Sequence, residues 1–123
     1  MNCPCCSGKS YQNCCEPYHL NKILPQTAEQ LMRSRYSAFA KVLPTYLMKT
    51  THESTQKNNN FSDIADWAKS NKWLKLEIGF AESNKVRFKA FYQDTNGDVY
   101  EHDELSIFKR ENGKWFYVDG EFY

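Results

Sequence analysis

The spacing of apolar residues changes once along the chain, close to Trp73. Before this position, apolar residues recur every three or four residues, as they do along the buried stripe of an amphipathic helix. After it, they alternate with polar residues, as on a strand that buries one of its two faces. The sequence therefore predicts an α+β fold in which helices pack on one face of a curved antiparallel sheet.

The first predicted helix begins after Thr27, a residue type that commonly caps helix N-termini. Gln30 follows three residues later, which gives the pattern of a capping box. The helix is expected to run to about Val42, just before Pro44. Its buried stripe would consist of Ala28, Leu31, Met32, Arg35, Phe39 and Leu43. Arg35 is unusual in such a stripe, because a buried charge is costly unless it is paired.

Two shorter helices are expected in the next segment. One should cover residues 44–51, which start at a proline, with His52 where it ends. Residues 56–63 are rich in asparagine and other polar residues and are expected to form a loop. Ser62 is the expected N-cap of a third helix over residues 63–70. Three helices should therefore precede the strands.

Four strands are expected from Trp73 onward, separated by turns at residues 83–84, 94–97 and 111–114. The alternating residues of the first strand are Leu74, Leu76, Ile78 and Phe80. One face of the third strand is expected to carry Tyr100, His102, Glu104, Ser106 and Phe108. One face of the last strand is expected to carry Trp115, Tyr117 and Asp119. These two faces combine aromatic and polar side chains.

All five cysteines lie between positions 3 and 15 of this 123-residue chain. A disulfide framework would instead tie distant parts of the fold together and would leave one cysteine unpaired. Two thiolates answered by a second pair are the donor set that structural zinc binds in a tetrahedron. The candidate ligands of Zn²⁺ are Cys3, Cys5, Cys14 and Cys15. Free buried cysteines, a redox-active vicinal pair and adventitious metal binding are the alternative interpretations.

Three other residues of this segment bear on the predicted site. Cys6 could replace a neighbour as ligand, act as a reactive thiol beside the metal or only occupy space, and the spacing favours the last two. His19 could substitute for a thiolate, but four cysteines already fill a tetrahedron, so a solvated or capping role is expected. Lys9 and the backbone N–H groups of the Ser7-Gly8 turn would offset the negative charge of four thiolates.

Composition describes a packed protein, with 41% hydrophobic, 15% aromatic and 25% charged residues. Sixteen basic and fifteen acidic residues leave a formal charge of +1, which lacks the basic excess that phosphate neutralisation favours. Nucleic-acid binding, through Lys9, Arg33 and the aromatic residues, is therefore the least favoured function class. The chain shows no apolar run long enough for a membrane span or a signal peptide, so a cytoplasmic protein is expected.

Residues 3–15 read CPCCSGKSYQNCC and resemble the SEC-C motif, the zinc-binding element known from the end of the SecA translocation motor. The motif matches at Cys3, Cys5, Ser7, Gly8, Lys9, Tyr11, Cys14 and Cys15. It departs at Cys6 and Glu16, where the SEC-C family usually has glycine. The resemblance implies zinc binding by the four cysteines at the matched positions.

The rest of the chain resembles the YchJ family of uncharacterised bacterial proteins. The resemblance rests on the strings AEQLMRSRYSAF, YLMKTTHEST and KRENGKWFYVDG. It implies a SEC-C-like knuckle over residues 1–19, a linker over residues 20–26 and a nuclear transport factor 2-like domain over residues 27–123. In that fold, three helices cover a strongly bent four-stranded sheet and enclose a pocket. No established activity comes with the family.

The pocket residues that we expect in this cone are Arg35, Tyr36, His52, Trp73, His102, Glu104, Ser106, Trp115, Tyr117 and Asp119. The favoured structural interpretation pairs Arg35 with Glu104 or Asp119 as a buried strut that sets the angle of helix on sheet. No catalytic residue is assigned by this prediction.

The favoured function is a protein-interaction or adaptor module in which the knuckle docks an unidentified protein partner and the cone holds a small ligand. In SecA the SEC-C element is linked to docking of an export chaperone, and the exposed residues here would be Lys9, Tyr11, Gln12 and Tyr18. The alternative is a small pocket enzyme of the hydrolase or isomerase kind. It would use His52 or His102 as a general base with Glu104 or Asp119.

Overall fold

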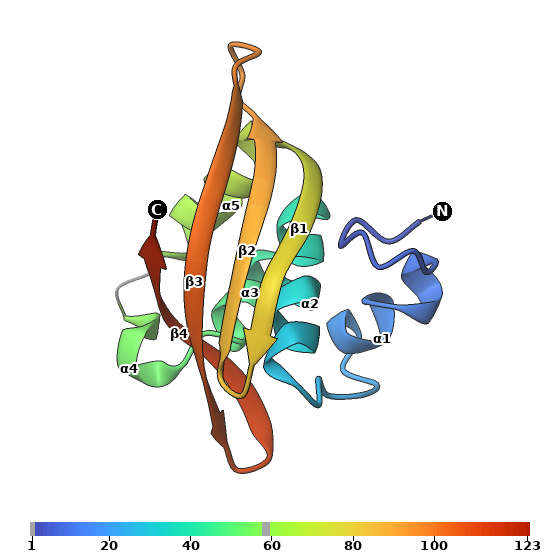
Figure 1. Ribbon diagram of the computed structural model, residues 1–123, viewed down its shortest axis with the longest axis vertical. Coiled ribbons are helices and arrows are strands. Elements are labelled where there is room, and N and C mark those ends of the chain that lie inside the picture. The colour runs from blue at the N-terminus through green and yellow to red at the C-terminus, as the bar shows by residue number, and fades with distance from the viewer. Residues whose placement is uncertain (1, 58–59) are drawn as a thin grey trace.

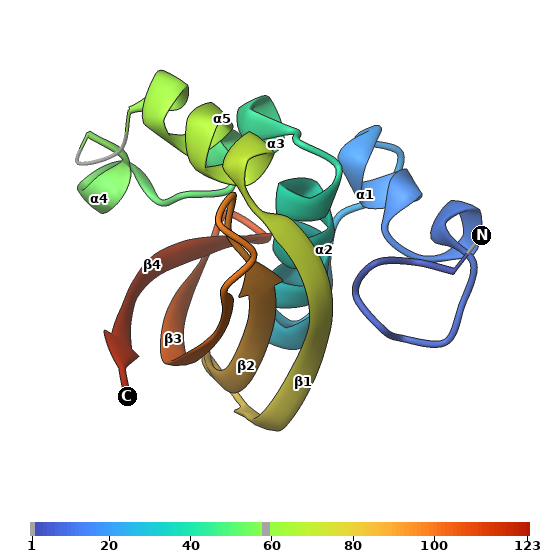
Figure 2. The ribbon, with the colours of Figure 1, turned by 90° about the horizontal axis from the view of Figure 1, so that it is seen from above.

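The structure, a computed structural model, describes residues 2–57 and 60–123. Within these residues the sheet has four antiparallel strands in the order β1-β2-β3-β4, so each strand pairs with the one before it. The strands are β1 Lys72–Glu82, β2 Lys85–Gln93, β3 Val99–Glu111 and β4 Lys114–Phe122. Figures 1 and 2 show the bent sheet with helices on its concave side. The predicted α+β cone is therefore confirmed.

Three helices correspond to the predicted ones, and three shorter elements were not expected. The bounds are η1 Tyr11–Asn13 (a 3₁₀ helix), α1 Glu16–His19, α2 Ala28–Ala40, α3 Pro44–Lys49, α4 Glu53–Gln56 and α5 Phe61–Ser70. The elements η1, α1 and α4 are too short to leave a periodic apolar pattern in the sequence. None of the helices in the described ranges has the length and apolar content that crossing a bilayer requires.

Helix α2 starts as predicted and ends two residues early. The Thr27 hydroxyl accepts a hydrogen bond from the Gln30 backbone N–H at 3.1 Å. The Gln30 side chain accepts from the backbone N–H of Gln26 at 2.6 Å, one residue before the position a capping box would use. The helix ends at Ala40, because Val42 has a φ of 56° and so lies in the left-handed region.

The N-terminus of α5 differs from the prediction. Asn60, rather than Ser62, is the N-cap, because its side-chain oxygen accepts from the N–H groups of Ser62 at 2.8 Å and Asp63 at 3.3 Å. Helix α5 therefore starts inside the predicted 56–63 loop. The first residue of that loop belongs to α4, and residues 58–59 lie outside the described part of the chain.

Strict alternation fails at both ends of β1. Register shifts against β2 occur between residues 73 and 75 and between residues 78 and 80. Leu74 and Phe80 are consequently 43% and 42% exposed, whereas Leu76 between them is buried. These two bulges therefore move apolar side chains of β1 out of the core.

A third register shift changes the inner face of β4. Tyr117 lies opposite Phe108, but Asp119 lies opposite Ile107. Residues directly opposite each other in a sheet share a face, so Val118 is the additional residue and Asp119 is turned to the other face. The prediction that Asp119 shares a face with Tyr117 is therefore wrong.

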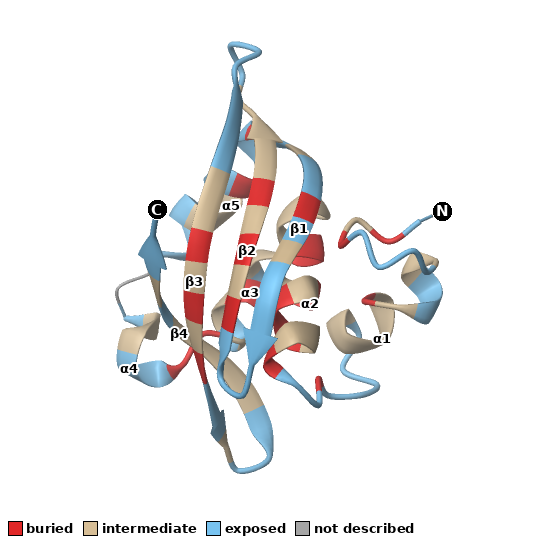
Figure 3. Cartoon of the chain, in the orientation of Figure 1, coloured by how far each residue is buried: buried red, intermediate tan, exposed pale blue. Residues whose placement is uncertain are grey.

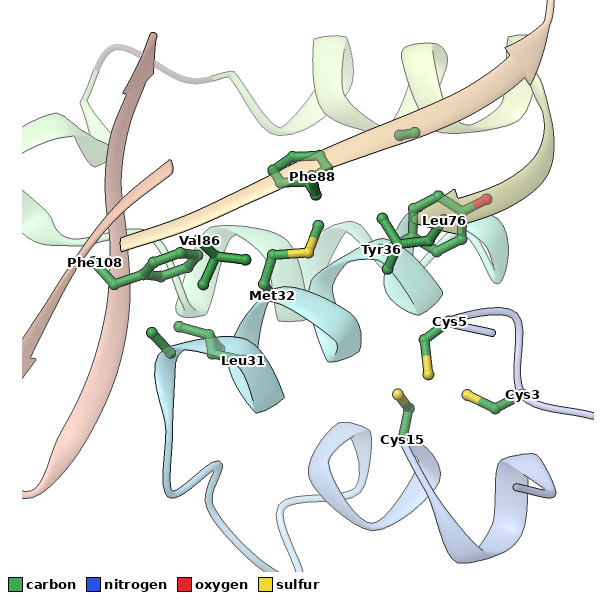
Figure 4. Close-up of a cluster of buried hydrophobic side chains, with 12 residues drawn as sticks. Cys3, Cys5, Cys15, Leu31, Met32, Tyr36, Leu76, Val86, Phe88 and Phe108 are labelled. Carbon is green, nitrogen blue, oxygen red and sulfur yellow. The ribbon is translucent and has the colours of Figure 1, made fainter. Parts of the chain in front are cut away.

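The knuckle and the cone share one hydrophobic core. Figure 3 shows buried residues on β2, β3 and α2 and in the N-terminal segment. Figure 4 shows Cys3, Cys5 and Cys15 beside α2, on the side away from the sheet. Their cluster also contains Ala28, Leu31, Met32, Tyr36, Leu76, Val86, Phe88, Ala90 and Phe108. Residues 20–26 connect the two parts along the chain, but the buried side chains on both sides are continuous.

Candidate functional site

The four predicted cysteines meet in one cluster. The Sγ atoms of Cys3, Cys5, Cys14 and Cys15 all lie within 4.8 Å of one another. Individual separations are 3.5 Å for Cys5–Cys14 and 3.8 Å for Cys14–Cys15. Four sulfurs around zinc, at a Zn–S distance of about 2.3 Å, are about 3.8 Å apart in a regular tetrahedron. This four-thiol cluster therefore has the donors and the size that a tetrahedral metal ion requires.

Local backbone geometry brings the two cysteine pairs together. A bridge between Asn2 and Ser10 closes the first loop, and the Cys3 N–H donates to the Lys9 carbonyl at 2.9 Å. Within that loop, Cys6 has a φ of 62°. This left-handed conformation explains why the SEC-C family usually has glycine at this position.

Cys6 itself lies outside the four-thiol cluster. It is exposed, and its Sγ accepts from the Leu76 N–H of β1 at 3.5 Å. Glu16, the other departure from the SEC-C pattern, is the first residue of α1, where an acidic side chain is favourable. Neither departure alters the set of four thiols.

Polar groups from α2 and from the first loop surround the thiols. Ser37 Oγ lies 3.3 Å from Cys3 Sγ, and Ser7 Oγ lies 3.1 Å from Cys14 Sγ. Arg33 donates from Nη1 to the Cys5 carbonyl at 2.8 Å, which brings a cation against the site. Lys9, the predicted source of compensating charge, is exposed. Charge compensation from α2 links the cluster to the helix that forms one wall of the cone.

Interactions among the thiols shift their pKa values in opposite directions. The neighbouring Cys15 thiol lowers the pKa of Cys5 to about 4, against the opposing effect of burial. The pKa of Cys15 is raised by its interaction with Cys5 and by burial. Burial likewise raises the pKa of Cys14. Four thiolates so close together would repel, and a bound cation relieves that repulsion.

His19 is neither solvated nor part of the thiol cluster. Its Nε2 donates to the Ser34 carbonyl at 2.8 Å, and this fixes Nδ1 as the acceptor of the Tyr11 hydroxyl at 2.6 Å. Its ring also meets Tyr46 edge to face at 4.8 Å. His19 therefore holds α1 and η1 against α2, and burial lowers its pKa.

The cone encloses a cavity of about 250 Å³ between α2, α5 and the concave face of the sheet. We call it the cone cavity. Of the predicted pocket residues, those that line it are Arg35, Tyr36, Trp73, His102, Glu104, Ser106 and Tyr117. The apolar residues that complete its wall include Met32, Phe39, Ile64, Trp67, Phe88, Ala90, Tyr92 and Phe108. The cavity thus combines an aromatic wall with a polar group of residues.

Three predicted pocket residues lie elsewhere. His52 caps α4, accepting from the Ser54 N–H at 3.1 Å, and its Nε2 lies 2.9 Å from Glu111. Trp115 lines a second cavity of about 450 Å³ between the chain around residues 18–25, α3 and β4. Asp119 is exposed on the other face of β4. His52 therefore lies outside the cone cavity, and the carboxylate that it meets is Glu111 rather than Glu104 or Asp119.

Glu104 is the centre of the polar group in the cone cavity. It is 5% exposed, and its carboxylate accepts from His102 Nε2 at 2.8 Å and from the Tyr117 hydroxyl at 3.0 Å. The Ser106 hydroxyl donates to the same oxygen as Tyr117. Burial alone would raise the pKa of Glu104, but these three donors outweigh it and hold the pKa below its ordinary value. We call these four residues the Glu104 network.

Gly120 makes room for this carboxylate. It lies opposite Ser106 on the neighbouring strand, and a Cβ atom added to it would overlap the Glu104 side chain. The sequence contains no local signal for this requirement, because the contact joins two strands.

Arg35 contacts the Glu104 network through the ring of Tyr117 and not through an ion pair with Glu104. Its guanidinium lies over the Tyr117 ring at 4.6 Å, and Nη1 donates to the Leu47 carbonyl and to Thr50 and Thr51. No ion pair in the described ranges joins Arg35 to a carboxylate. The predicted pairing of Arg35 with Glu104 or Asp119 is therefore wrong, because the Tyr117 ring lies against Arg35 and its hydroxyl donates to Glu104.

Comparison with known proteins places this architecture. The description "YchJ, middle NTF2-like domain" belongs to a family whose model matches residues 27–120. The chain belongs to the YchJ family. It is 40% identical to the UPF0225 protein of Actinobacillus succinogenes over 95% of this chain and 79% of the relative. A UPF0225 protein of Haemophilus influenzae is 41% identical over 96% of this chain and 76% of the relative.

Two solved structures resemble this YchJ-family chain over nearly its whole length. A SEC-C motif containing protein from Rhodopseudomonas palustris is 30% identical, with a TM-score of 0.89 and 98% of each chain covered. A SEC-C motif containing protein from Psychrobacter arcticus is also 30% identical, with a TM-score of 0.78, and the match covers 95% of this chain and 80% of that one. The knuckle and the cone therefore occur together in these relatives.

Several residues of the cavity were not predicted from the sequence. Trp67 and Tyr92 meet at 5.3 Å, edge to face, and both lie against Trp73. Tyr92 could have been found by continuing the alternation of Phe88 and Ala90 by one more step. Trp67 could not, because its role depends on how α5 lies across the open end of the sheet.

Proposed function

We propose that this protein binds a small organic molecule in the cone cavity, while a structural zinc ion in the four-thiol cluster holds the knuckle against the cone. The observation that carries the proposal is the cavity of about 250 Å³, lined by aromatic rings with a few polar groups. Ligand pockets in proteins have this make-up. Aromatic side chains provide a large apolar contact area, and the polar groups fix the orientation of a ligand.

Zinc fits the four-thiol cluster as a structural ion. Four cysteine thiolates fill its tetrahedral coordination and leave no position for a reacting water. The ion would stabilise the thiolate forms together and so remove the opposed pKa shifts of the cysteines. Since the cluster packs on α2, the metal would also fix the helix that supplies Arg35, Tyr36 and Phe39 to the cavity.

A screen with a matched pair of variants tests ligand binding. A library of single-ring compounds is screened by ligand-observed NMR against the wild type, Ala90→Phe and Lys89→Phe. Ala90 is buried and lines the cavity, whereas Lys89 is its neighbour on the opposite face of β2. Ligands of the cavity should bind the wild type and Lys89→Phe but not Ala90→Phe. No hits, or only hits that survive in Ala90→Phe, would refute the proposal.

Docking of a protein partner by the knuckle is a second candidate function, favoured by the exposure of Lys9 and Gln12. Tyr11 and Tyr18 contribute less, because they are half-buried and Tyr11 is bound to His19. Deleting residues 1–19 would remove part of the core and is a poor test. Lys9→Glu with Gln12→Ala, compared with wild type in affinity purification, is the sharper experiment. Identical partners in both would count against docking through this surface.

An enzymatic role would depend on His102 with Glu104, which are hydrogen-bonded at the cavity. His102→Gln should then abolish turnover of a ligand found in the screen, while its binding persists. Unchanged turnover would remove His102 from any mechanism.

A further inference from the structure

Arg35 has hydrogen-bonding capacity that the protein does not use. Its Nη1 donates to the Leu47 carbonyl at 2.9 Å, to Thr50 Oγ1 at 2.7 Å and to Thr51 Oγ1 at 3.3 Å. Within residues 2–57 and 60–123, its Nη2 and Nε donate to no acceptor. Arg35 is half-buried and lines the cone cavity. The arginine is therefore anchored by one nitrogen, with the remaining two nitrogens of its planar fork left for another partner.

We propose that the cone cavity binds a small aromatic carboxylic acid, whose carboxylate is held by Nη2 and Nε of Arg35. The inference rests on the proposed ligand-binding function and names the class of ligand. Arginine binds a carboxylate through two parallel N–H···O bonds, and these two nitrogens present that geometry.

The hydrogen bonds already present in the cavity determine which ligand charge is favoured. Glu104 is the acidic group in the cavity wall, and its two oxygens already accept from His102, Ser106 and Tyr117. A cationic ligand would have to compete with these three donors. A ligand with acceptor oxygens meets instead the unused donors of Arg35, so an anion is favoured over a cation.

A second polar group near the cavity is also unpaired among the described residues. The hydroxyl of Tyr36 is buried and has no hydrogen-bond partner among the described residues. Tyr36 directly follows Arg35 in α2 and lines the same cavity. Buried polar groups are normally paired. The charges that act on this hydroxyl are those of Cys6 and Cys5, so it lies toward the knuckle, and the carboxylate is assigned to Arg35 alone.

The wall and the volume define the rest of the ligand. Tyr36, Phe39, Trp67 and Tyr92 line the cavity and surround Trp73 at centroid distances of 5.3 to 6.3 Å. An engineered cavity of about 150 Å³ holds one benzene molecule. The 250 Å³ available here therefore suits one aromatic ring with a short carboxylate side chain.

The charges in the cavity tolerate a monoanion. Burial lowers the pKa of Arg35 to about 10, so the guanidinium stays charged at neutral pH and lacks full solvation. A carboxylate would restore part of that lost solvation. Glu104 would repel it, but the Tyr117 ring stands between Arg35 and Glu104, whose own charge is spread over three donors.

The test compares three probes of nearly the same shape: phenylacetate, phenylacetamide and phenethylamine. Their affinities for the zinc-loaded protein are measured by NMR titration at neutral pH. Phenylacetate should bind at least about tenfold more tightly than the amide, and the amine should bind most weakly. Ala90→Phe should remove binding. Arg35→Lys keeps the charge but loses the planar fork, so it should weaken phenylacetate binding at least about tenfold. Arg110→Lys, at an exposed arginine outside the cavity, should leave phenylacetate binding unchanged.

The outcomes separate this inference from the function on which it rests. If the amide or the amine binds as tightly as the acid and Ala90→Phe removes that binding, the cavity binds ligands but the carboxylate assignment is wrong. Phenylacetate binding that survives in Ala90→Phe contradicts both. Failure of all three probes overturns the assignment, whereas ligand binding itself falls only if the wider screen finds no cavity-dependent ligand. The comparison of probes on wild type holds even if Arg35→Lys fails to fold.

Discussion

The protein buries two groups of polar side chains, and the two differ in how they are satisfied. The Glu104 network is complete within the chain, because one carboxylate accepts from three donors on β3 and β4. The four-thiol cluster is not complete, because thiols so close together compete for protons. One group is therefore a self-contained hydrogen-bond network, and the other has the donor set for a metal ion.

The two groups therefore contribute to the stability of the fold under different conditions. A satisfied buried network contributes modestly and needs no bound ion, since its hydrogen bonds replace those made with water. A structural metal site contributes much more, but only while the metal is bound. Cys3, Cys5 and Cys15 belong to the same hydrophobic core as α2. We therefore expect the stability of the cone, and not only that of the knuckle, to depend on metal binding.

The largest expected effect comes from removing the metal. Purified, reduced protein should contain about one zinc per chain, and Cys14→Ser with Cys15→Ser should lose it. Structural zinc contributes apparent binding energies of roughly 10–16 kcal/mol, so the double variant should lose at least ~4 kcal/mol of unfolding free energy. Elemental analysis and urea unfolding measure both. Cys6→Ser is the control and should keep its zinc. Metal near zero in the native protein, or one equivalent retained in the double variant, would contradict the assignment.

The next effect tests how tightly the Glu104 network is packed. Gly120→Ala places a Cβ where the Glu104 carboxylate lies, so the side chain or the strand must move. The expected loss is about 3 kcal/mol of unfolding free energy. Gly79→Ala, on the edge strand β1, is the matched control. Its Cβ would come no closer than 3.3 Å to any neighbour, the nearest atom being the Arg87 carbonyl oxygen, so a smaller loss is expected. Equal losses in both variants would show that Glu104 is not held in place.

A smaller effect isolates the charge of Glu104. Glu104→Gln keeps the shape and leaves one former donor unmatched, for an expected loss of about 1–2 kcal/mol at pH 7. The folded state holds the pKa of Glu104 below its ordinary value of 4.5. The stabilisation is therefore fully present above pH 4.5 and is lost as the pH falls through the folded-state pKa.

The difference in unfolding free energy between wild type and Glu104→Gln, measured from pH 7 to pH 3, should narrow in acid. Protonation of the cysteines would release a bound metal from both proteins, so this contribution would cancel in that difference. A gap that widens as the pH falls would show that the carboxylate is not stabilised in its ionised form.

Signals that are local in sequence predicted the structure well. The four cysteines, the cap at Thr27 and the turns between strands each depend on a few neighbouring residues. Alternation on β3 also placed His102, Glu104 and Ser106 on the concave face, as the cavity confirms. These features needed no knowledge of the packing.

Features that depend on partners across the fold were predicted poorly. Asp119 leaves the inner face because of one additional residue against β3, which no property of β4 alone reveals. Arg35 was expected to meet a carboxylate, but the C-terminal end of α3 offers it a carbonyl and two hydroxyls instead. The role of His52 was missed for the same reason, because its partner Glu111 is distant in sequence.

The smallest expected effect concerns Cys6, which lies beside the thiol cluster without joining it. Its φ of 62° costs a side-chain residue about 1–2 kcal/mol relative to glycine. Cys6→Gly would relieve this strain but lose the weak bond from the Leu76 N–H at 3.5 Å, for a net gain below about 1 kcal/mol. Cys6→Val should instead lose about 1–2 kcal/mol, since a β-branched residue fits this conformation poorly. Both variants should bind one zinc per chain. Loss of metal from Cys6→Gly, which removes the thiol without adding backbone strain, would show that Cys6 is a ligand.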